Sequence, residues 1–207
     1  MSVAEEFATV DAVLASGAET RGVDAFALAV IKAERQIRKL FTHLIFQYPA
    51  FSSGDVRALR ESLAENRGVY FEGLLAGFDA LYPRSVRELV GPEHQRLEDR
   101  LKEAIDHRNK IFHGQLTKPS LSREDLLAYV ADIRAWCCAL ADSALAEIGY
   151  DGFARNSFRK SAIPDIWKSF RMQLSSVEDY AKFIREHMQR SNKPLQRAAP
   201  SQPERRR

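Results

Sequence analysis

The feature that most constrains the fold is the recurrence of apolar residues at intervals of three and four along most of this 207-residue chain. In an α-helix, residues three and four apart share a face, so this spacing predicts amphipathic helices that pack by their apolar sides. Within residues 23–48 the apolar positions are Phe26, Val30, Ile37, Leu40, Phe41 and Leu44. The alternating pattern of half-buried strands does not occur, and neither does an internal repeat. The chain is therefore predicted to be all-α.

Start and stop signals divide the pattern into four long helices. The predicted helices span residues 23–48, 55–82, 92–112 and 122–147. In the second of these, Gly73 and Gly77 lie one turn apart, which favours close contact with another helix over a ligand site. Four long amphipathic helices joined by short loops predict an up-and-down bundle, with additional helices at the C-terminus.

Composition along the chain predicts three parts. Residues 1–150 form the helical bundle, and residues 151–189 form a C-terminal helical extension packed on it. This extension begins with an irregular connector and continues as a helical segment from about Asp165 to Gln189, with a break near Ser175 and Ser176. The last part, residues 190–207, is rich in Pro, Gln, Ser and Arg, a composition that buries too little apolar area to order itself. We expect a disordered basic tail there.

Several function classes lack support in the sequence. No apolar run approaches the roughly 18 residues that cross a bilayer, and the acidic N-terminus is unlike a signal peptide, so we expect a cytoplasmic protein without membrane contact. The adjacent Cys137 and Cys138 are expected to be buried thiols rather than a disulfide. Zinc-ligand spacing, a Gly-rich phosphate loop and a Gly-x-Ser-x-Gly elbow do not occur, so neither a metal nor a cofactor is expected.

The residues with the clearest chemical potential are Arg108 and His113, at the end of the third predicted helix and directly before Gly114. An arginine is a permanent cation with donors suited to phosphate oxygens, and a histidine exchanges protons near neutral pH. Together they suffice in kind to cleave RNA without a metal. His113 would take the proton of a ribose 2′-hydroxyl or protonate the departing 5′-oxygen, while Arg108 stabilises the charge on the phosphate. The products would carry 2′,3′-cyclic phosphate and 5′-hydroxyl ends.

This spacing alone is weak, because three more Arg–His pairs resemble it. They are Arg38 with His43, Arg87 with His94, and Arg100 with His107. Context separates them, since the first lies inside a continuous apolar-faced helix, the second spans a Gly-Pro loop and the third ends in the middle of a helix. On the first helix, Glu34 is expected to pair with Arg38 one turn away. Glu34, Arg35 and Arg38 are interpreted as surface ion pairs, with a place at the edge of the site as the alternative.

The hexapeptide Arg108-Asn109-Lys110-Ile111-Phe112-His113 closely resembles the R-x(4–6)-H motif of the HEPN superfamily, in its common form with Asn after Arg. The helix order over about residues 24–148 resembles that family as well. The resemblance implies an all-helical domain that dimerises so that two motifs meet in a shared cleft. It also implies a metal-independent endoribonuclease, a type found among toxins and in phage-defence systems.

Carried over by residue, the resemblance implies that Arg108 and His113 are catalytic and that Asn109 is their supporting polar residue. Further RNA contacts are expected from basic residues beside the motif and after the bundle: His107, Lys110, Arg155, Arg159 and Lys160. HEPN toxins paired with a nucleotidyltransferase antitoxin carry a Tyr two positions after the His, where this chain has Gln115. That form of regulation is therefore in doubt, although an antitoxin or regulatory protein of another kind stays possible.

Two other interpretations remain open. In the first, the His113 ring caps carbonyls at a helix end, with Gly114 in the left-handed conformation and Arg108 near the negative end of the helix dipole. In the second, the chain is a non-catalytic HEPN-like module that binds RNA or a protein through the basic residues of segment 155–171 and the tail.

Overall fold

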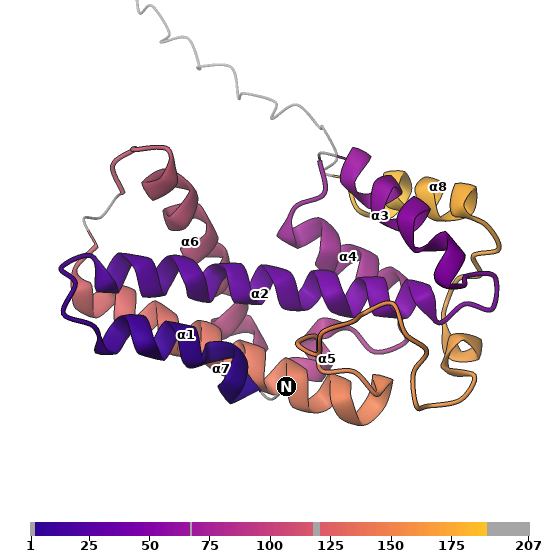
Figure 1. Ribbon diagram of the computed structural model, residues 1–207, viewed down its shortest axis with the longest axis horizontal. Helices are drawn as coiled ribbons and strands as arrows, with labels where there is room; N and C mark the ends of the chain where they lie inside the picture. Colours follow the sequence, from indigo (N-terminus) through magenta and orange to yellow (C-terminus); the bar gives the residue numbers. More distant parts are fainter. Residues whose placement is uncertain (1–2, 67, 118–120, 190–207) are drawn as a thin grey trace, which may run out of the picture.

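The computed structural model describes residues 3–66, 68–117 and 121–189. Within these ranges the chain forms eight α-helices and two short 3₁₀ helices, η1 and η2, and no strand (Figure 1). The all-α prediction is confirmed. The predicted disordered tail, residues 190–207, lies outside the described ranges.

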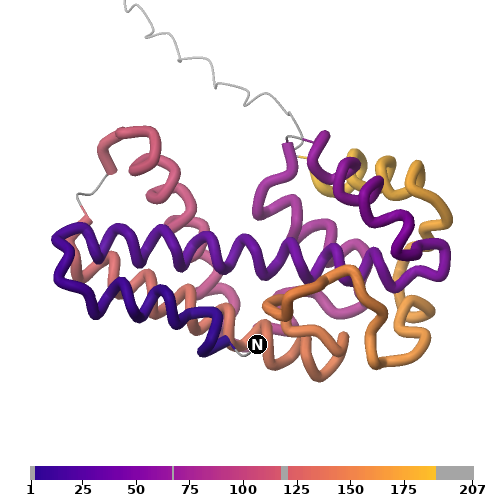
Figure 2. The backbone as a smooth tube through the Cα atoms, viewed as in Figure 1, coloured from indigo at the N-terminus to yellow at the C-terminus, as the bar shows by residue number. Residues whose placement is uncertain are grey.

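Two long helices form the spine of the molecule. Helix α2 (Arg21–Phe46) and helix α7 (Arg123–Ile148) have 26 residues each and lie side by side (Figures 1 and 2). The apolar positions predicted for the first helix are all fully buried in α2, so its periodicity did identify the core face. Helix α1 (Val3–Ala15), which was not predicted, packs against both and covers one side of the pair.

Shorter helices pack against α2, α7 or both at separate places along this spine. Helix α6 (His94–Phe112) packs on α7 and α2, α4 (Phe71–Leu81) packs on α2, and α5 (Val86–Val90) packs on α7. At the far end of α2, α3 (Val56–Glu65) lies against α8 (Val177–His187). Helices α6 and α4 rise from the same side of α2 at different points along it (Figure 2). A cleft between them is lined by residues of α6, α4 and α2.

The predicted second long helix is wrong. Residues 55–82 divide into the end of η1 (Ser53–Asp55), then α3 and, after a break in the helix, α4. The Asn66 side chain donates to the Ser62 carbonyl, which closes α3, and Tyr70 is extended with φ −100° and ψ −173°. Because the chain changes direction here, α3 can pair with α8 while α4 stays on α2. The molecule is therefore not a simple bundle of four long helices.

The predicted helix from Asp165 to Gln189 is helical mainly in its second half. The 3₁₀ helix η2 (Ile166–Ser169) and α8 are separated by a non-helical stretch that is longer than the predicted break. Before η2, residues 149–164 cross α2 as an irregular segment, called here the connector. The Lys160 ammonium holds it there by donating to the carbonyls of Phe46, Tyr48 and Phe51 at 2.6, 2.9 and 3.0 Å.

Gly73 and Gly77 have the packing role predicted for them. A Cβ on Gly73 would lie 2.1 Å from the carbonyl oxygen of Met188, and one on Gly77 would lie 2.8 Å from the Met188 side chain. The absence of side chains on this face of α4 thus lets the end of α8 approach its backbone.

Cys137 is a buried free thiol, as expected, whereas Cys138 is a free thiol that is only half-buried, and burial raises the pKa of both. Among the described helices, none combines the length and the apolar character that crossing a bilayer requires.

Candidate catalytic cleft

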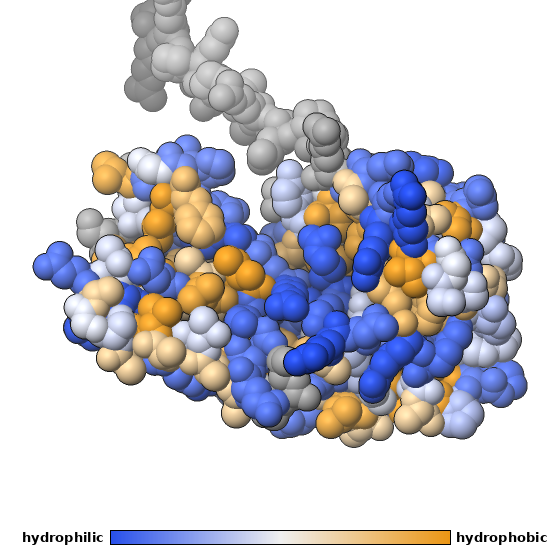
Figure 3. Space-filling view, in the orientation of Figure 1, coloured by the Kyte–Doolittle hydropathy of each residue, from blue (hydrophilic) through white to orange (hydrophobic). Residues whose placement is uncertain are grey.

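A cleft of about 520 Å³ lies between α6, α2 and the start of α4. Its lining residues are Ile105, Arg108, Asn109 and His113 from α6 and its end, Glu34 and Arg38 from α2, and the opposite wall from segment 69–74. Figure 3 shows this region as a hollow with a largely hydrophilic surface between the two lobes of the molecule. The structure therefore brings all three predicted catalytic residues, Arg108, Asn109 and His113, to one cleft.

Helical geometry explains why these α6 residues share a face. At about 100° per residue, positions 105, 108 and 109 point to one side of the helix, and position 113 follows 109 by one turn. His107 lies on the other side. Asn109 and His113 are exposed at the cleft surface, whereas the Arg108 side chain is only 14% exposed.

The end of α6 places His113 without using its ring. Gly114 is left-handed with φ +64°, its amide donates to the Ile111 carbonyl at 3.0 Å, and the Gln115 amide donates to the Lys110 carbonyl at 2.8 Å. These two backbone bonds satisfy the last carbonyls of the helix. The predicted left-handed Gly114 is confirmed. The alternative in which the His113 ring caps the helix is not, since within the described ranges this ring has no hydrogen-bond or ion-pair partner.

Arg108 is held in place by a carboxylate from another helix. Its Nη2 donates to Glu34 Oε1 at 2.6 Å, and its guanidinium carbon lies 5.7 Å from the centre of the Phe112 ring. The expected pair between Glu34 and Arg38 is wrong, because Glu34 pairs across helices with Arg108. Arg108 Nε is enclosed and has no acceptor among the described residues, a costly state for a buried donor.

The charges on the described residues that line the cleft are balanced in number. Arg38 and Arg108 face Glu34 and Glu72, so any attraction for an anion depends on where each charge lies. Glu34 is engaged by Arg108, whereas Arg38 is exposed and forms no ion pair with a described residue. An uncompensated cation therefore stands on the α2 floor of the cleft.

His113 differs from the other four histidines, all of which lie in the described ranges. His43, His94 and His107 are buried, and His187 is half-buried against Phe183 at 4.7 Å between ring centres. His43 stacks on Tyr150 at 4.5 Å, and burial lowers its pKa to about 4. His43 is thus part of the core and does not share a site with Arg38, which is exposed and lines the cleft. Among the histidines, His113 is the exposed one.

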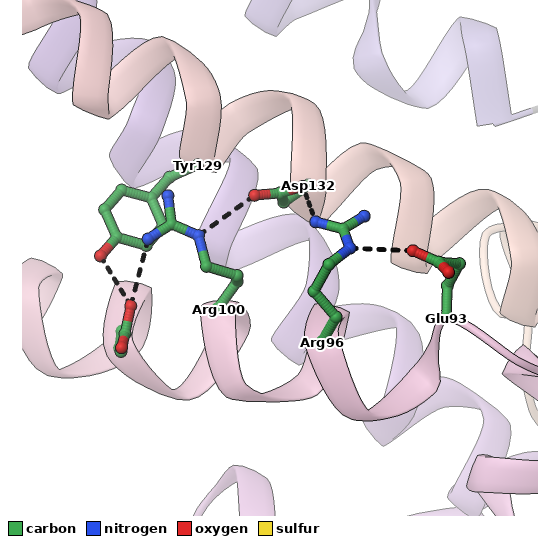
Figure 4. A network of polar contacts seen from close by, with 6 residues as sticks. Glu93, Arg96, Arg100, Tyr129 and Asp132 are labelled. Atoms are coloured by element: carbon green, nitrogen blue, oxygen red, sulfur yellow. Dashed lines mark hydrogen bonds and ion pairs between the residues drawn. The ribbon is translucent and has the colours of Figure 1, made fainter.

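The predicted RNA contact at His107 lies away from the cleft. His107 packs edge-on against Tyr129 of α7, with ring centres 5.7 Å apart, in a separate pocket of about 430 Å³. In the neighbouring turns of α6, Arg96 and Arg100 donate to Asp132 at 2.7 and 3.1 Å, and the guanidinium of Arg100 lies 3.7 Å from the centre of the Tyr129 ring (Figure 4). Burial would raise the pKa of Asp132, but the two arginine hydrogen bonds outweigh it and lower that pKa. This network fixes α6 on α7 and so fixes the backbone that carries Arg108.

The other predicted RNA contacts are also outside the cleft. Lys110 pairs with Asp106 at 2.5 Å, and Lys160 binds the three carbonyls at the end of α2. Arg155 and Arg159 are exposed on the connector that crosses α2. The sequence grouping of basic residues therefore does not correspond to a single surface.

Tyr70 lines the cleft opposite α6 and was missed as a site residue, because it was assigned to the apolar face of the predicted second helix. It is 55% exposed and precedes the first residue of α4. The helix-breaking residues Asn66 and Gly68 just before it were the available signal.

Within the described ranges, no three His, Cys, Asp or Glu side chains are grouped so that they could hold a metal ion. Comparison of this chain with family models, with curated proteins and with solved structures finds no match.

Proposed function

We propose that this protein is a metal-independent endoribonuclease and that the cleft of Arg108 and His113 is its active site. The observation that carries the proposal is that a helix end places the one exposed histidine in the same cleft as a half-buried arginine oriented by Glu34. The resemblance of the Arg108–His113 hexapeptide to the HEPN motif agrees with this assignment. A role in toxin or phage-defence systems is part of the same proposal.

In the proposed reaction the ribose 2′-oxygen attacks the adjacent phosphorus, and the bond from phosphorus to the 5′-oxygen breaks. A base removes the 2′-hydroxyl proton and an acid protonates the departing 5′-oxygen, which gives 2′,3′-cyclic phosphate and 5′-hydroxyl ends. His113 performs one of these proton transfers. Arg108 stabilises the charge that develops on the phosphate. Asn109 supports the same phosphate through its amide.

A second copy of the chain would supply the other proton-transfer group. One cleft holds a single histidine, whereas the reaction uses both an acid and a base, so a two-fold axis through the cleft brings a second His113 to it. Large apolar side chains next to His113 support this arrangement, since Phe112 is 60% exposed and Leu116 is 90% exposed. Burial of such side chains favours association.

Tyr70 would bind the substrate on the opposite wall of the cleft. Exposed aromatic rings are the usual stacking surface for unpaired bases, and sequence-independent stacking suits a ribonuclease that acts on single-stranded segments. The substrate class proposed is therefore single-stranded RNA.

The second candidate function is a non-catalytic module that binds RNA or a protein. The pair between Glu34 and Arg108 is the observation that favours it, because the carboxylate occupies one side of the guanidinium and repels an incoming phosphate. In that case the cleft binds a partner without catalysing a reaction.

Cleavage of RNA in EDTA by wild type, Arg108→Ala and His113→Ala tests the proposal. We expect both substitutions to abolish cleavage while circular dichroism shows an unchanged fold. Lys110→Ala is the matched control, because Lys110 lies on the same helix, carries a positive charge and pairs with Asp106 outside the cleft. Inactive wild type, or cleavage retained in His113→Ala, would favour the binding module.

A further inference from the structure

A second hollow, called here the basic groove, lies beside the cleft and is lined by cationic side chains. It has a volume of about 290 Å³ between α2, α3 and the connector, and its lining includes Arg38, Lys39, Arg60 and Arg155 above the apolar Leu63 and Phe158. None of the described residues that line it is acidic. Figure 3 shows strongly hydrophilic side chains on the same face as the hollow and next to it. This surface therefore differs from the cleft, where the formal charges of the described lining residues balance.

The cations of the basic groove differ in the contacts that they make with the rest of the protein. The Lys39 ammonium donates to the carbonyls of Phe153 and Ala154 at 3.1 and 2.9 Å, so it holds the connector in place. The guanidinium carbon of Arg60 lies 5.0 Å from the centre of the Phe158 ring. Arg38, Arg60 and Arg155 form no ion pair with any described residue. Three uncompensated guanidinium groups around one hollow are a phosphate-binding arrangement.

Arg38 connects the basic groove with the cleft, because it lines both. Glu34, Arg38 and Thr42 follow one another at four-residue intervals on α2 and so form a single row along that helix. Glu34 lines the cleft and Thr42 lines the basic groove, with Arg38 between them. An extended strand that leaves the cleft along α2 therefore meets Arg38 first and the basic groove next.

We propose that single-stranded RNA bound in the cleft continues along α2 over Arg38, and that the basic groove binds the phosphates flanking the cleavage position through Arg60 and Arg155. This inference rests on the proposed function, because it assigns the path of the same substrate. Leu63 and Phe158 provide the apolar contacts for a base or ribose, with Phe158 partly buried against Phe46 at 5.7 Å between ring centres. Binding by this route is electrostatic and tolerant of sequence.

The test measures binding separately from cleavage, in a His113→Ala background that does not cut. Fluorescence anisotropy compares a single-stranded RNA that spans both hollows with a dinucleotide that fits the cleft alone. The test variant is Arg60→Ala with Arg155→Ala, and the charge-matched control is Arg87→Ala with Arg123→Ala, two exposed arginines on α5 and α7 that line neither hollow. Each double variant removes two positive charges.

We expect the groove variant to weaken binding of the long RNA on the order of tenfold and to reduce its salt slope by about 1.4, for two lost phosphate contacts on a single strand. The groove variant should bind the dinucleotide as tightly as the parent His113→Ala protein does. The control variant should bind the long RNA as tightly as that parent. Equal weakening by both double variants, or none by the groove variant, would overturn the inference.

Cleavage assays of the same two double variants with His113 retained separate the ribonuclease proposal from the groove proposal. Suppose that wild type cuts RNA, and that the groove variant binds and cuts the long RNA with the affinity and rate of wild type. The groove inference then fails and the proposed function stands. If wild type never cuts RNA but the groove variant alone loses affinity for the long RNA, the ribonuclease fails and the basic groove stands as an RNA-binding surface.

Discussion

At the scale of single residues, the candidate site depends on a contact between helices, because Glu34 of α2 accepts a hydrogen bond from Arg108 of α6 at 2.6 Å. Arg108 and His113 were identifiable from their position at a helix end before Gly114, and Asn109 from the resemblance of the hexapeptide to the HEPN motif. Glu34 was assigned to Arg38 by a local rule for helix neighbours, yet it pairs with Arg108, which is 74 positions away in sequence. A partner from another helix becomes visible only when packing is known, because helix spacing carries no information on long-range pairs.

Glu34 is predicted to position Arg108 rather than to take part in the chemistry. Glu34→Ala should lower kcat roughly a hundredfold through misplacement of the guanidinium, whereas Glu34→Gln retains an acceptor oxygen and should recover most of the loss. Steady-state cleavage assays of both variants measure this difference. The control is Asp106→Ala, which removes the carboxylate that pairs with half-buried Lys110 on α6 and should leave kcat unchanged. Equal activity of the Ala and Gln variants at position 34 would count against a positioning role.

At the scale of elements, the long helices were predictable and the breaks between short ones were not. The positions of α2 and α7 could be predicted from the spacing of their apolar residues and from the helix start and stop signals at Pro49, Ser122 and Gly149. Residues 55–82 kept helical periodicity on both sides of Asn66, so the pattern did not show that the chain turns there. The turn is decided by the packing of α3 against α8, far apart in sequence.

The contact between α4 and α8 is predicted to tolerate no side chain at position 73. Gly73→Ala should lower the free energy of unfolding by about 1–3 kcal/mol, because its Cβ would meet the Met188 carbonyl rather than a movable side chain. Urea denaturation measures the change. Gly17→Ala is the control, since a Cβ there has nothing within 4 Å. The contact would be unimportant if both variants unfolded at the same urea concentration.

The buried His43 predicts a pH dependence of stability within the contact of α2 and the connector. Burial lowers its pKa from 6.5 to about 4, so between these values the unfolded chain binds a proton that the folded chain does not. Stability is therefore complete above about pH 6.5 and falls as the pH drops towards 4, with a loss of about 2 kcal/mol between pH 7 and pH 5 from this group. His43→Phe keeps a ring against Tyr150 and should show a correspondingly smaller loss. Urea denaturation of both proteins at the two pH values checks this, and parallel losses would contradict it.

At the scale of the whole molecule, α6 and α4 pack at different points along the same side of α2, and the cleft lies between these two helices. The sequence predicted the all-helical class but not this arrangement, because amphipathic faces show that helices pack without showing which helices meet. The same limit applies to the surface, because the sequence does not show that Phe112 and Leu116 are exposed.

The proposed dimer predicts that a charge next to the cleft separates the copies. Leu116→Glu should shift the protein to a 23.5 kDa monomer and lower cleavage, because a 90% exposed side chain contributes little to folding but is placed to be buried between two copies. Light scattering at several concentrations and cleavage assays measure both effects. Leu145→Glu is the control, since Leu145 is 57% exposed on α7 and does not line the cleft. A wild-type protein that is monomeric while it cuts RNA would contradict the dimer.

The most direct test of the central claim is the end chemistry of RNA fragments made in EDTA by wild type and by His113→Ala. Mass spectrometry should find 2′,3′-cyclic phosphate and 5′-hydroxyl ends for wild type and no fragments for the variant. Fragments with 3′-hydroxyl and 5′-phosphate ends, or the same cleavage by His113→Ala, would contradict the assignment of Arg108 and His113 as an active site that uses the ribose 2′-hydroxyl.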